Sequence, residues 1–191
     1  MRYLFAVAVV IALLLGLVTG AFAASQYHVA KISIGDDVSQ VFKSLGTPSA
    51  VQIIDNKDAA SSIQLLYFHG KESLAIDVTD LPDNRVTQIE VCGASWPTDL
   101  PAKCGMDIDT LVTSLGTPDA TKDVSAQKKW VLDQVGKNGD LKSLVEYSVG
   151  DTAAYYYKLG LLLEYDKSAR IIKSVRILDP AKAPGMSLTV S

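Results

Sequence analysis

Two stretches of this chain share one pattern: GDDVSQVFKSLGTP at residues 35–48 and GMDIDTLVTSLGTP at residues 105–118. They align without a gap, each opens on a glycine (Gly35 and Gly105), and both end in Ser-Leu-Gly-Thr-Pro. A match of this kind is hard to obtain by chance and is the usual sign of an internal repeat. We therefore predict two copies of one folding unit.

Each stretch has the features of a short helix with a defined start and end. Asp37 and Asp107 stand at the N-cap, where a carboxylate accepts hydrogen bonds from the first turn. The apolar residues then recur at helical spacing. They are Val38, Val41, Phe42 and Leu45 in the first copy and Ile108, Leu111, Val112 and Leu115 in the second. The residues that end the two helices are Gly46 with Pro48, and Gly116 with Pro118.

Strand-like runs separated by turn residues follow both helices. In the first unit we expect strands near residues 51–54, 63–68, 74–78 and 86–91. In the second unit we expect them near residues 129–134, 144–149, 155–165 and 171–178. Antiparallel strands with one short helix per unit define an α+β fold, in which the two sheets can join into one continuous curved sheet. A helix across one face would bury Leu74, Ile76, Ile89 and Val91 in the first unit, and Leu159, Leu161, Leu163 and Val175 in the second.

The N-terminal residues have the pattern of a secretory signal peptide. Arg2 precedes an apolar run over residues 3–18, and Ala21-Phe22-Ala23 provides a small-x-small exit. An uncleaved membrane anchor is the alternative, but the run is shorter than the roughly 20 residues that span a bilayer. We expect cleavage near Ala23 and an exported chain, periplasmic or secreted. The net charge of −3, without basic clusters, gives no reason to expect nucleic-acid binding.

These features divide the chain into five parts. They are a signal peptide (1–23), a first repeat (24–92), a linking loop (93–104), a second repeat (105–179) and a flexible tail (180–191). Cys92 and Cys104 flank the linking loop, and export to an oxidising compartment favours a disulfide between them. Closing this loop would contribute on the order of 3 kcal/mol.

No catalytic motif stands out in the sequence. The two histidines, His28 and His69, do not accompany a nucleophile in a known pattern, and Gly-x-Ser-x-Gly is absent. Asp77, Asp80 and Asp83 lack the ligand order of a calcium loop, so a solvated turn is the favoured interpretation. We predict no catalytic residue, no cofactor and no metal. A histidine–carboxylate metal site and an unfamiliar hydrolase are the less favoured alternatives.

Four residues are candidates for contact with a partner. Trp96 lies in the linking loop, where it either anchors a partner or folds back over the junction between units. If residues 155–165 form one strand, Tyr157 joins the core, while Tyr156, Lys158 and Glu164 share the open face. Aromatic residues are favoured at interfaces, although ordinary cross-strand packing is the alternative for Tyr156.

The helix motif, with its glycine, capping residue, apolar stripe and Leu-Gly-x-Pro, resembles the BamE-like family of small bacterial envelope lipoproteins, which assist outer-membrane protein assembly. The tandem arrangement is similar to that of the β-lactamase inhibitory proteins. The resemblance implies a noncatalytic protein that binds another protein in the cell envelope or outside the cell, as an inhibitor or as an assembly factor. A small-ligand carrier that uses the open sheet face is the alternative.

Overall fold

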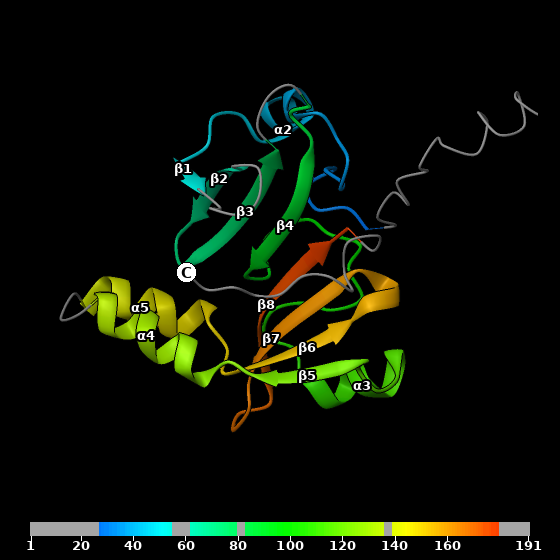
Figure 1. Cartoon of the computed structure of the whole chain (residues 1–191), viewed down its shortest axis with the longest axis vertical. Coiled ribbons are helices and arrows are strands. Elements are labelled where there is room, and N and C mark those ends of the chain that lie inside the picture. Colours follow the sequence, from blue (N-terminus) through cyan, green and yellow to red (C-terminus); the bar gives the residue numbers. More distant parts are fainter. Residues whose placement is uncertain (1–26, 55–61, 80–82, 136–138, 180–191) are drawn as a thin grey trace, which may run out of the picture.

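The computed structural model describes residues 27–54, 62–79, 83–135 and 139–179 (Figure 1). The expected signal peptide and C-terminal tail lie outside these residues, as does Asp80. None of the described helices is both long enough and apolar enough to cross a membrane.

One antiparallel sheet of eight strands organises the described residues, in the order β1-β2-β3-β4-β8-β7-β6-β5 (Figure 1). The first four strands are β1 (Ala50–Ile54), β2 (Ser62–His69), β3 (Glu72–Thr79) and β4 (Val86–Cys92). The other four are β5 (Ala120–Asp123), β6 (Thr152–Tyr156), β7 (Leu161–Asp166) and β8 (Ile171–Leu178). Strands β4 and β8 pair at the centre, from Gln88 opposite Leu178 to Val91 opposite Val175. The predicted α+β class is therefore confirmed, with a single continuous sheet.

The two predicted helices form as expected: α2 (Val38–Leu45) and α3 (Ile108–Leu115). The side chain of Asp37 accepts a hydrogen bond from the Ser39 N–H, and the side chain of Asp107 accepts one from the Asp109 N–H. Gly46 and Gly116 follow the last turns with φ of 74° and 86°, a backbone region that favours glycine. Their N–H groups donate to the carbonyls four residues back, on Phe42 and Val112.

Both helix motifs attach to the sheet through corresponding hydrogen bonds. The N–H of Gly35 donates to the carbonyl of Val86 at the start of β4, and the N–H of Gly105 donates to that of Ile172 in β8. At the other ends of the helices, the hydroxyl of Tyr67 donates to the Gly46 carbonyl. The hydroxyl of Tyr156 makes the same bond to the Gly116 carbonyl.

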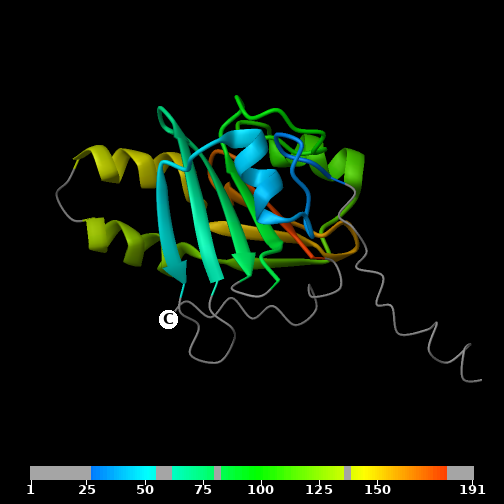
Figure 2. The ribbon, with the colours of Figure 1, turned by 90° about the horizontal axis from the view of Figure 1, so that it is seen from above.

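The core lies between the sheet and these two helices, and Figure 2 shows α2 across one face of the first strands. Its buried side chains come from both halves of the sheet. They include the predicted Leu74, Ile76, Ile89, Val91, Leu161, Leu163 and Val175, while Leu159 is only partly buried. Residues 27–34 and the 93–104 loop complete the core with Val29, Ile32, Ile34, Leu100 and Ala102.

The prediction of strands near 129–134 and 144–149 is wrong. Residues 129–134 lie in helix α4 (Ser125–Val135), and residues 144–148 lie in helix α5 (Gly139–Ser148). The two helices form a hairpin between β5 and β6 (Figure 1). Ala126, Leu132 and the intervening Gln and Lys residues are good helix formers. Asp123 also accepts a hydrogen bond from the N–H of Ser125 at the start of α4. Aromatic and β-branched residues in both segments suggested strands, but the helix propensity of the surrounding residues outweighed their strand propensity.

The predicted strand 155–165 is two strands joined by a tight turn. A short 3₁₀ helix over Tyr157–Leu159 ends β6, and Gly160 adopts the left-handed conformation with φ 62°. The Gly160 N–H donates to the Tyr157 carbonyl, so the chain reverses and β7 returns beside β6. The reversal changes which residues share a face, and this affects the candidate contact residues below.

Candidate functional site

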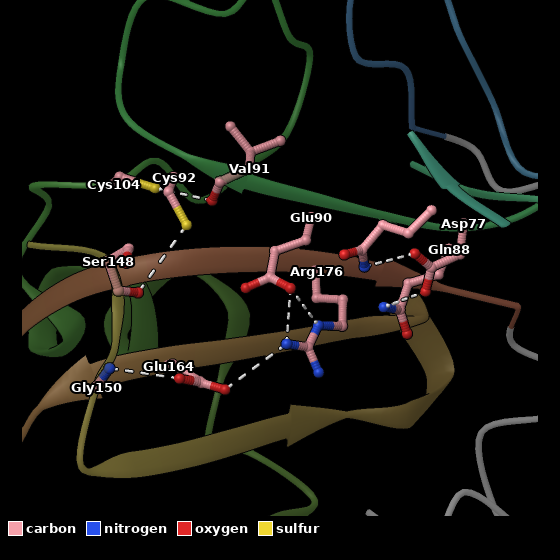
Figure 3. A network of polar contacts seen from close by, with 11 residues as sticks. Asp77, Gln88, Glu90, Val91, Cys92, Cys104, Ser148, Gly150, Glu164 and Arg176 are labelled. Atoms are coloured by element: carbon pink, nitrogen blue, oxygen red, sulfur yellow. Dashed lines mark hydrogen bonds and ion pairs between the residues drawn. The ribbon is translucent and has the colours of Figure 1, made fainter. Parts of the chain in front are cut away.

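A network of charged and amide side chains links neighbouring strands of the sheet (Figure 3). These side chains lie on the open face of the sheet, opposite the core face that carries α2 and α3. Arg176 in β8 lies directly across from Glu90 in β4. Its Nη2 and Nε atoms lie 2.7 and 3.1 Å from Oε2 of Glu90. Nη2 also lies 3.8 Å from Oε1 of Glu164 in β7. One guanidinium thus joins three neighbouring strands.

Asp77 extends the network toward the first strands. Its carboxylate accepts hydrogen bonds from Nε2 of Gln64 in β2 at 2.8 Å and from Nε2 of Gln88 in β4 at 3.0 Å (Figure 3). Burial raises the pKa of Asp77, and the hydrogen bond from Gln64 opposes this. The prediction that Asp77 lies in a solvated turn is wrong, because Asp77 is inside β3 and its half-buried side chain accepts hydrogen bonds from Gln64 and Gln88.

Glu164 is the most buried carboxylate of the network. Its Oε2 accepts a hydrogen bond from the Gly150 N–H at 3.3 Å. Burial raises the pKa of Glu164, while the charge of Arg176 opposes the shift. The Gly150 N–H and the Arg176 guanidinium therefore both stabilise the carboxylate form of Glu164. We interpret Glu164 as part of a structural ion network.

The network could have been anticipated only in part. Its members all lie on strands, at positions that face the open side of the sheet, and they are Gln64, Asp77, Gln88, Glu90, Glu164 and Arg176. The pairing of β4 with β8 that brings Arg176 to Glu90 was not visible in the chain. The chemistry of this arrangement is mutual neutralisation, since each carboxylate already accepts hydrogen bonds from, or pairs with, a neighbour.

The two cysteines are free thiols, so the predicted disulfide is absent from the structure. Each thiol donates to a backbone carbonyl: Cys104 to Val91 at 3.2 Å, and Cys92 to Ser148 at 3.9 Å. Burial raises the pKa of both thiols, that of Cys104 to about 11. Cys104 lies next to the end of β4, but both thiols donate to carbonyl oxygens and form no disulfide with each other.

Tyr156, Lys158 and Glu164 do not share a surface. Tyr156 is 3% exposed and lies in the helix-covered core, which overturns its assignment to the open face. Lys158 is exposed in the 3₁₀ turn, and Glu164 is buried on the opposite side of the sheet. The physical reason is the reversal at Gly160, which breaks the alternation assumed from Tyr155 to Tyr165. Tyr157 is half-buried against a second, smaller apolar cluster and is not part of the main core.

Trp96 folds back onto the protein. It is partly buried against the main core and also lines a surface groove of about 630 Å³ between α2 and the 93–104 loop, with the 27–34 segment at its side. Six residues of this groove are Ala30, Lys31, Lys43, Leu45, Trp96 and Pro97. Trp96 therefore packs against the core and also lines a groove, while both roles expected for it, as a partner anchor and as a cover for the junction between units, stay predictions.

Strand β1 forms an open edge of the described sheet. Its only strand neighbour is β2, with Val51 opposite Leu65 and Ile53 opposite Ile63. Val51 and Ile53 are 60% and 72% exposed, although the side chains opposite them are buried or half-buried. The sequence contains this signal in Ala-Val-Gln-Ile-Ile, a strand without charge or proline, but strand order was needed to place it at an edge.

The histidines make no metal site within the described part of the chain. Nδ1 of His28 lies 2.9 Å from Oδ2 of Asp99, and both side chains are exposed. No group of three or more His, Cys, Asp or Glu side chains among the described residues is arranged to hold a metal ion.

No protein-family model matches the chain, and no curated protein matches it. Among solved structures, the chain is similar to an extracellular protein containing an SCP domain from Bacillus anthracis str. Ames, with 12% identity and a TM-score of 0.48. The match covers 78% of this chain but only 45% of that protein.

Proposed function

We propose that this is a noncatalytic exported protein that binds another protein in the cell envelope or outside the cell. The partner would add an extended segment to the free edge of β1. The observation that carries the proposal is the exposure of Val51 and Ile53 on β1, one of the two edge strands of the described antiparallel sheet. Strand addition of this kind gains affinity from main-chain hydrogen bonds and specificity from alternate side chains.

The physical argument rests on how edge strands are normally protected. Natural proteins place lysine, proline, bulges or covering segments at a free edge to prevent unwanted pairing. Strand β1 contains only Ala, Val, Gln and Ile, and its register with β2 is regular from Ala50 to Ile54. Within the described residues, β1 therefore lacks these protective features. An apolar edge of this kind favours unwanted pairing in an unbound chain, and it suits a chain that receives a partner strand.

The open face is a weaker candidate for the same role. Its centre is filled by the ion network around Arg176, whose charges are already paired. At one end α5 reaches it, because the Ser148 carbonyl lies 3.9 Å from the thiol of Cys92. This moves the proposed binding surface from the open face, where the sequence suggested it, to β1.

We further propose that the chain consists of two BamE-like units. The strand order supports this proposal, since β1-β2-β3-β4 meets β8-β7-β6-β5 in mirror sequence. The corresponding hydrogen bonds of Gly35 and Gly105, and of Tyr67 and Tyr156, support it as well. In this scheme the α4–α5 hairpin is an insertion between β5 and β6, at the place of the β1–β2 connection.

An affinity capture tests the binding proposal. Mature chain 24–191 is immobilised and exposed to envelope and secreted extracts of the source organism. We expect a stoichiometric partner that is lost with V51K/I53K and retained with W130K, a control that removes another exposed apolar side chain, 51% exposed, in α4. Equal capture by all three proteins would overturn the β1 proposal.

The outcome also separates the versions of the function. An inhibitor blocks a captured enzyme in a one-to-one complex, whereas an assembly factor associates with a larger membrane complex without inhibition. If nothing is captured and native mass spectrometry of the fresh protein shows retained small-molecule mass, the ligand-carrier alternative replaces protein binding.

A further inference from the structure

We infer that the groove between α2 and the 93–104 loop is a second binding site, separate from β1, and that it takes an extended acidic peptide segment. The groove measures about 630 Å³, within the roughly 300–1,000 Å³ of typical ligand sites. Three independent features of its lining support this inference: the charge, the strained turn that presents Lys31, and the state of the Trp96 ring.

The first feature is a local reversal of charge. Lys31 and Lys43 line the groove, and no acidic residue of the described chain does, although the whole chain carries a net charge of −3. Both side chains are exposed, and neither ammonium forms an ion pair with a described carboxylate. Two unpaired cations around an apolar floor are complementary to carboxylates on a chain that lies between them.

The second feature is the turn that presents Lys31. Ala30 and Lys31 connect Val29 to Ile32 in a two-residue reversal, with hydrogen bonds of 3.0 and 2.9 Å between Val29 and Ile32. Both turn residues have positive φ, 50° and 67°, where asparagine and glycine are normally found. Backbone strain of this kind often marks functional positions.

The strained turn is fixed against the loop that carries Trp96. The Ala30 N–H donates to the carbonyl of Pro97 at 2.7 Å. This bond holds Lys31 at the groove on one side, while Lys43 stands in the last turn of α2 on the other. The two lysines are thus carried by separate elements that are both anchored to the protein, so the backbone that presents them needs little rearrangement when a ligand binds.

The third feature is the floor of the groove. The indole N–H of Trp96 is buried and has no acceptor among the described residues. A buried donor without an acceptor destabilises the folded chain. Among the described residues, only packing therefore holds the indole in place. A shift of the ring toward a ligand carbonyl or carboxylate would pair this N–H without breaking an existing hydrogen bond. With Leu45 and Pro97, the ring makes an apolar platform of the kind that accepts the aliphatic part of a peptide.

The proposal is tested with a W130F variant of the mature chain, in which Trp96 is the single tryptophan. A short peptide that alternates Asp and Leu is titrated while the emission of Trp96 is followed. The same peptide with Asn for Asp is the control ligand, and inorganic phosphate is the control anion. We expect a saturable emission shift with the acidic peptide, at least tenfold weaker binding of the Asn peptide, and no comparable shift with phosphate.

Two pairs of lysine variants decide the assignment. K31Q/K43Q should weaken the acidic peptide at least tenfold, while K122Q/K167Q, which removes the same charge from exposed positions outside the groove, should change it less than twofold. Equal losses in both pairs, equal response to phosphate, or no emission shift would each overturn the site. V51K/I53K should leave the binding of the acidic peptide unchanged. Failure of this site and failure of the β1 proposal can therefore be distinguished.

Discussion

Arg176 and Glu90 form a cross-strand ion pair with 2.7 Å between Nη2 and Oε2, and it joins β8 to β4 at the centre of the sheet. The two residues are far apart in sequence, and each belongs to a different half of the chain. The pair therefore fastens the two halves to each other. Charging a carboxylate and a guanidinium in a covered site is costly unless each neutralises the other.

Removing Arg176 should leave two covered carboxylates without their cation. We expect R176M to lower the free energy of unfolding by about 3–5 kcal/mol, measured by urea denaturation at pH 7. K173M, on the same strand, is the control and should cost less than about 1 kcal/mol. The double variant R176M/E90Q should recover part of the loss. A cost below about 1 kcal/mol for R176M would show that the network does not hold the halves together.

The pH dependence of stability should reveal the buried state of Glu164. Burial raises the pKa of Glu164 above its ordinary value of 4.5, so the folded protein favours the protonated carboxyl. Its contribution to stability is fully present below that ordinary value and is lost as the pH rises through the raised pKa. Arg176, Glu90, Lys128 and the Gly150 N–H act on the group, and only Arg176, Lys128 and the N–H oppose the shift.

The measurement compares the wild type with Glu164→Gln by urea denaturation from pH 4 to pH 8. The wild type should lose stability relative to the variant as the pH rises above about 4.5, since the amide side chain of the variant cannot acquire the charge. A difference that stays constant over this range would mean that Glu164 is not strained by burial.

The two helix stripes should differ in importance along their length. Val41 and Leu111 are fully buried, whereas Leu45 and Leu115 are only partly so. Leu111→Ala should therefore cost about 2–5 kcal/mol, and Leu115→Ala clearly less, in the same denaturation assay. Equal costs at both positions would contradict the burial seen in α3.

The thiols should be present, covered and unreactive. In the native protein at pH 8, iodoacetamide should modify Cys92 and Cys104 slowly, because burial raises their pKa values and limits access. After unfolding in urea without reductant, mass analysis should show two labels. No labels without reductant, and two after reduction, would instead establish the disulfide expected from the sequence.

The sequence predicted the parts of the fold that depend on local pattern. Neighbouring residues in the sequence determine three features that the structure confirms. They are the capping by Asp37 and Asp107, the helix ends at Gly46 and Gly116, and the alternating buried residues Leu74, Ile76, Ile89 and Val91. It failed at α4 and α5, where a few aromatic and β-branched residues suggested strands and the helix formers around them decided otherwise.

Features that depend on strand order could not be predicted from the sequence. Glu90 meets Arg176 only because β4 pairs with β8, and Tyr156 reaches the core only because the chain reverses at Gly160. The exposure of Val51 and Ile53 likewise follows from the place of β1 at an edge. The candidate sites were therefore identified from the structure. Of the contact residues proposed from the sequence, Trp96 lines the groove beside α2.

The most direct test of partner binding at β1 is amide hydrogen exchange of the captured complex compared with the free mature chain. The account predicts stronger protection of residues 50–54 in the complex, because a partner strand would engage the alternate N–H groups of β1 that do not bond to β2. Strand β5, at the other edge of the sheet, is the internal control and should exchange equally in both states. Unchanged exchange at 50–54, with protection elsewhere, would contradict the account and place the partner on another surface.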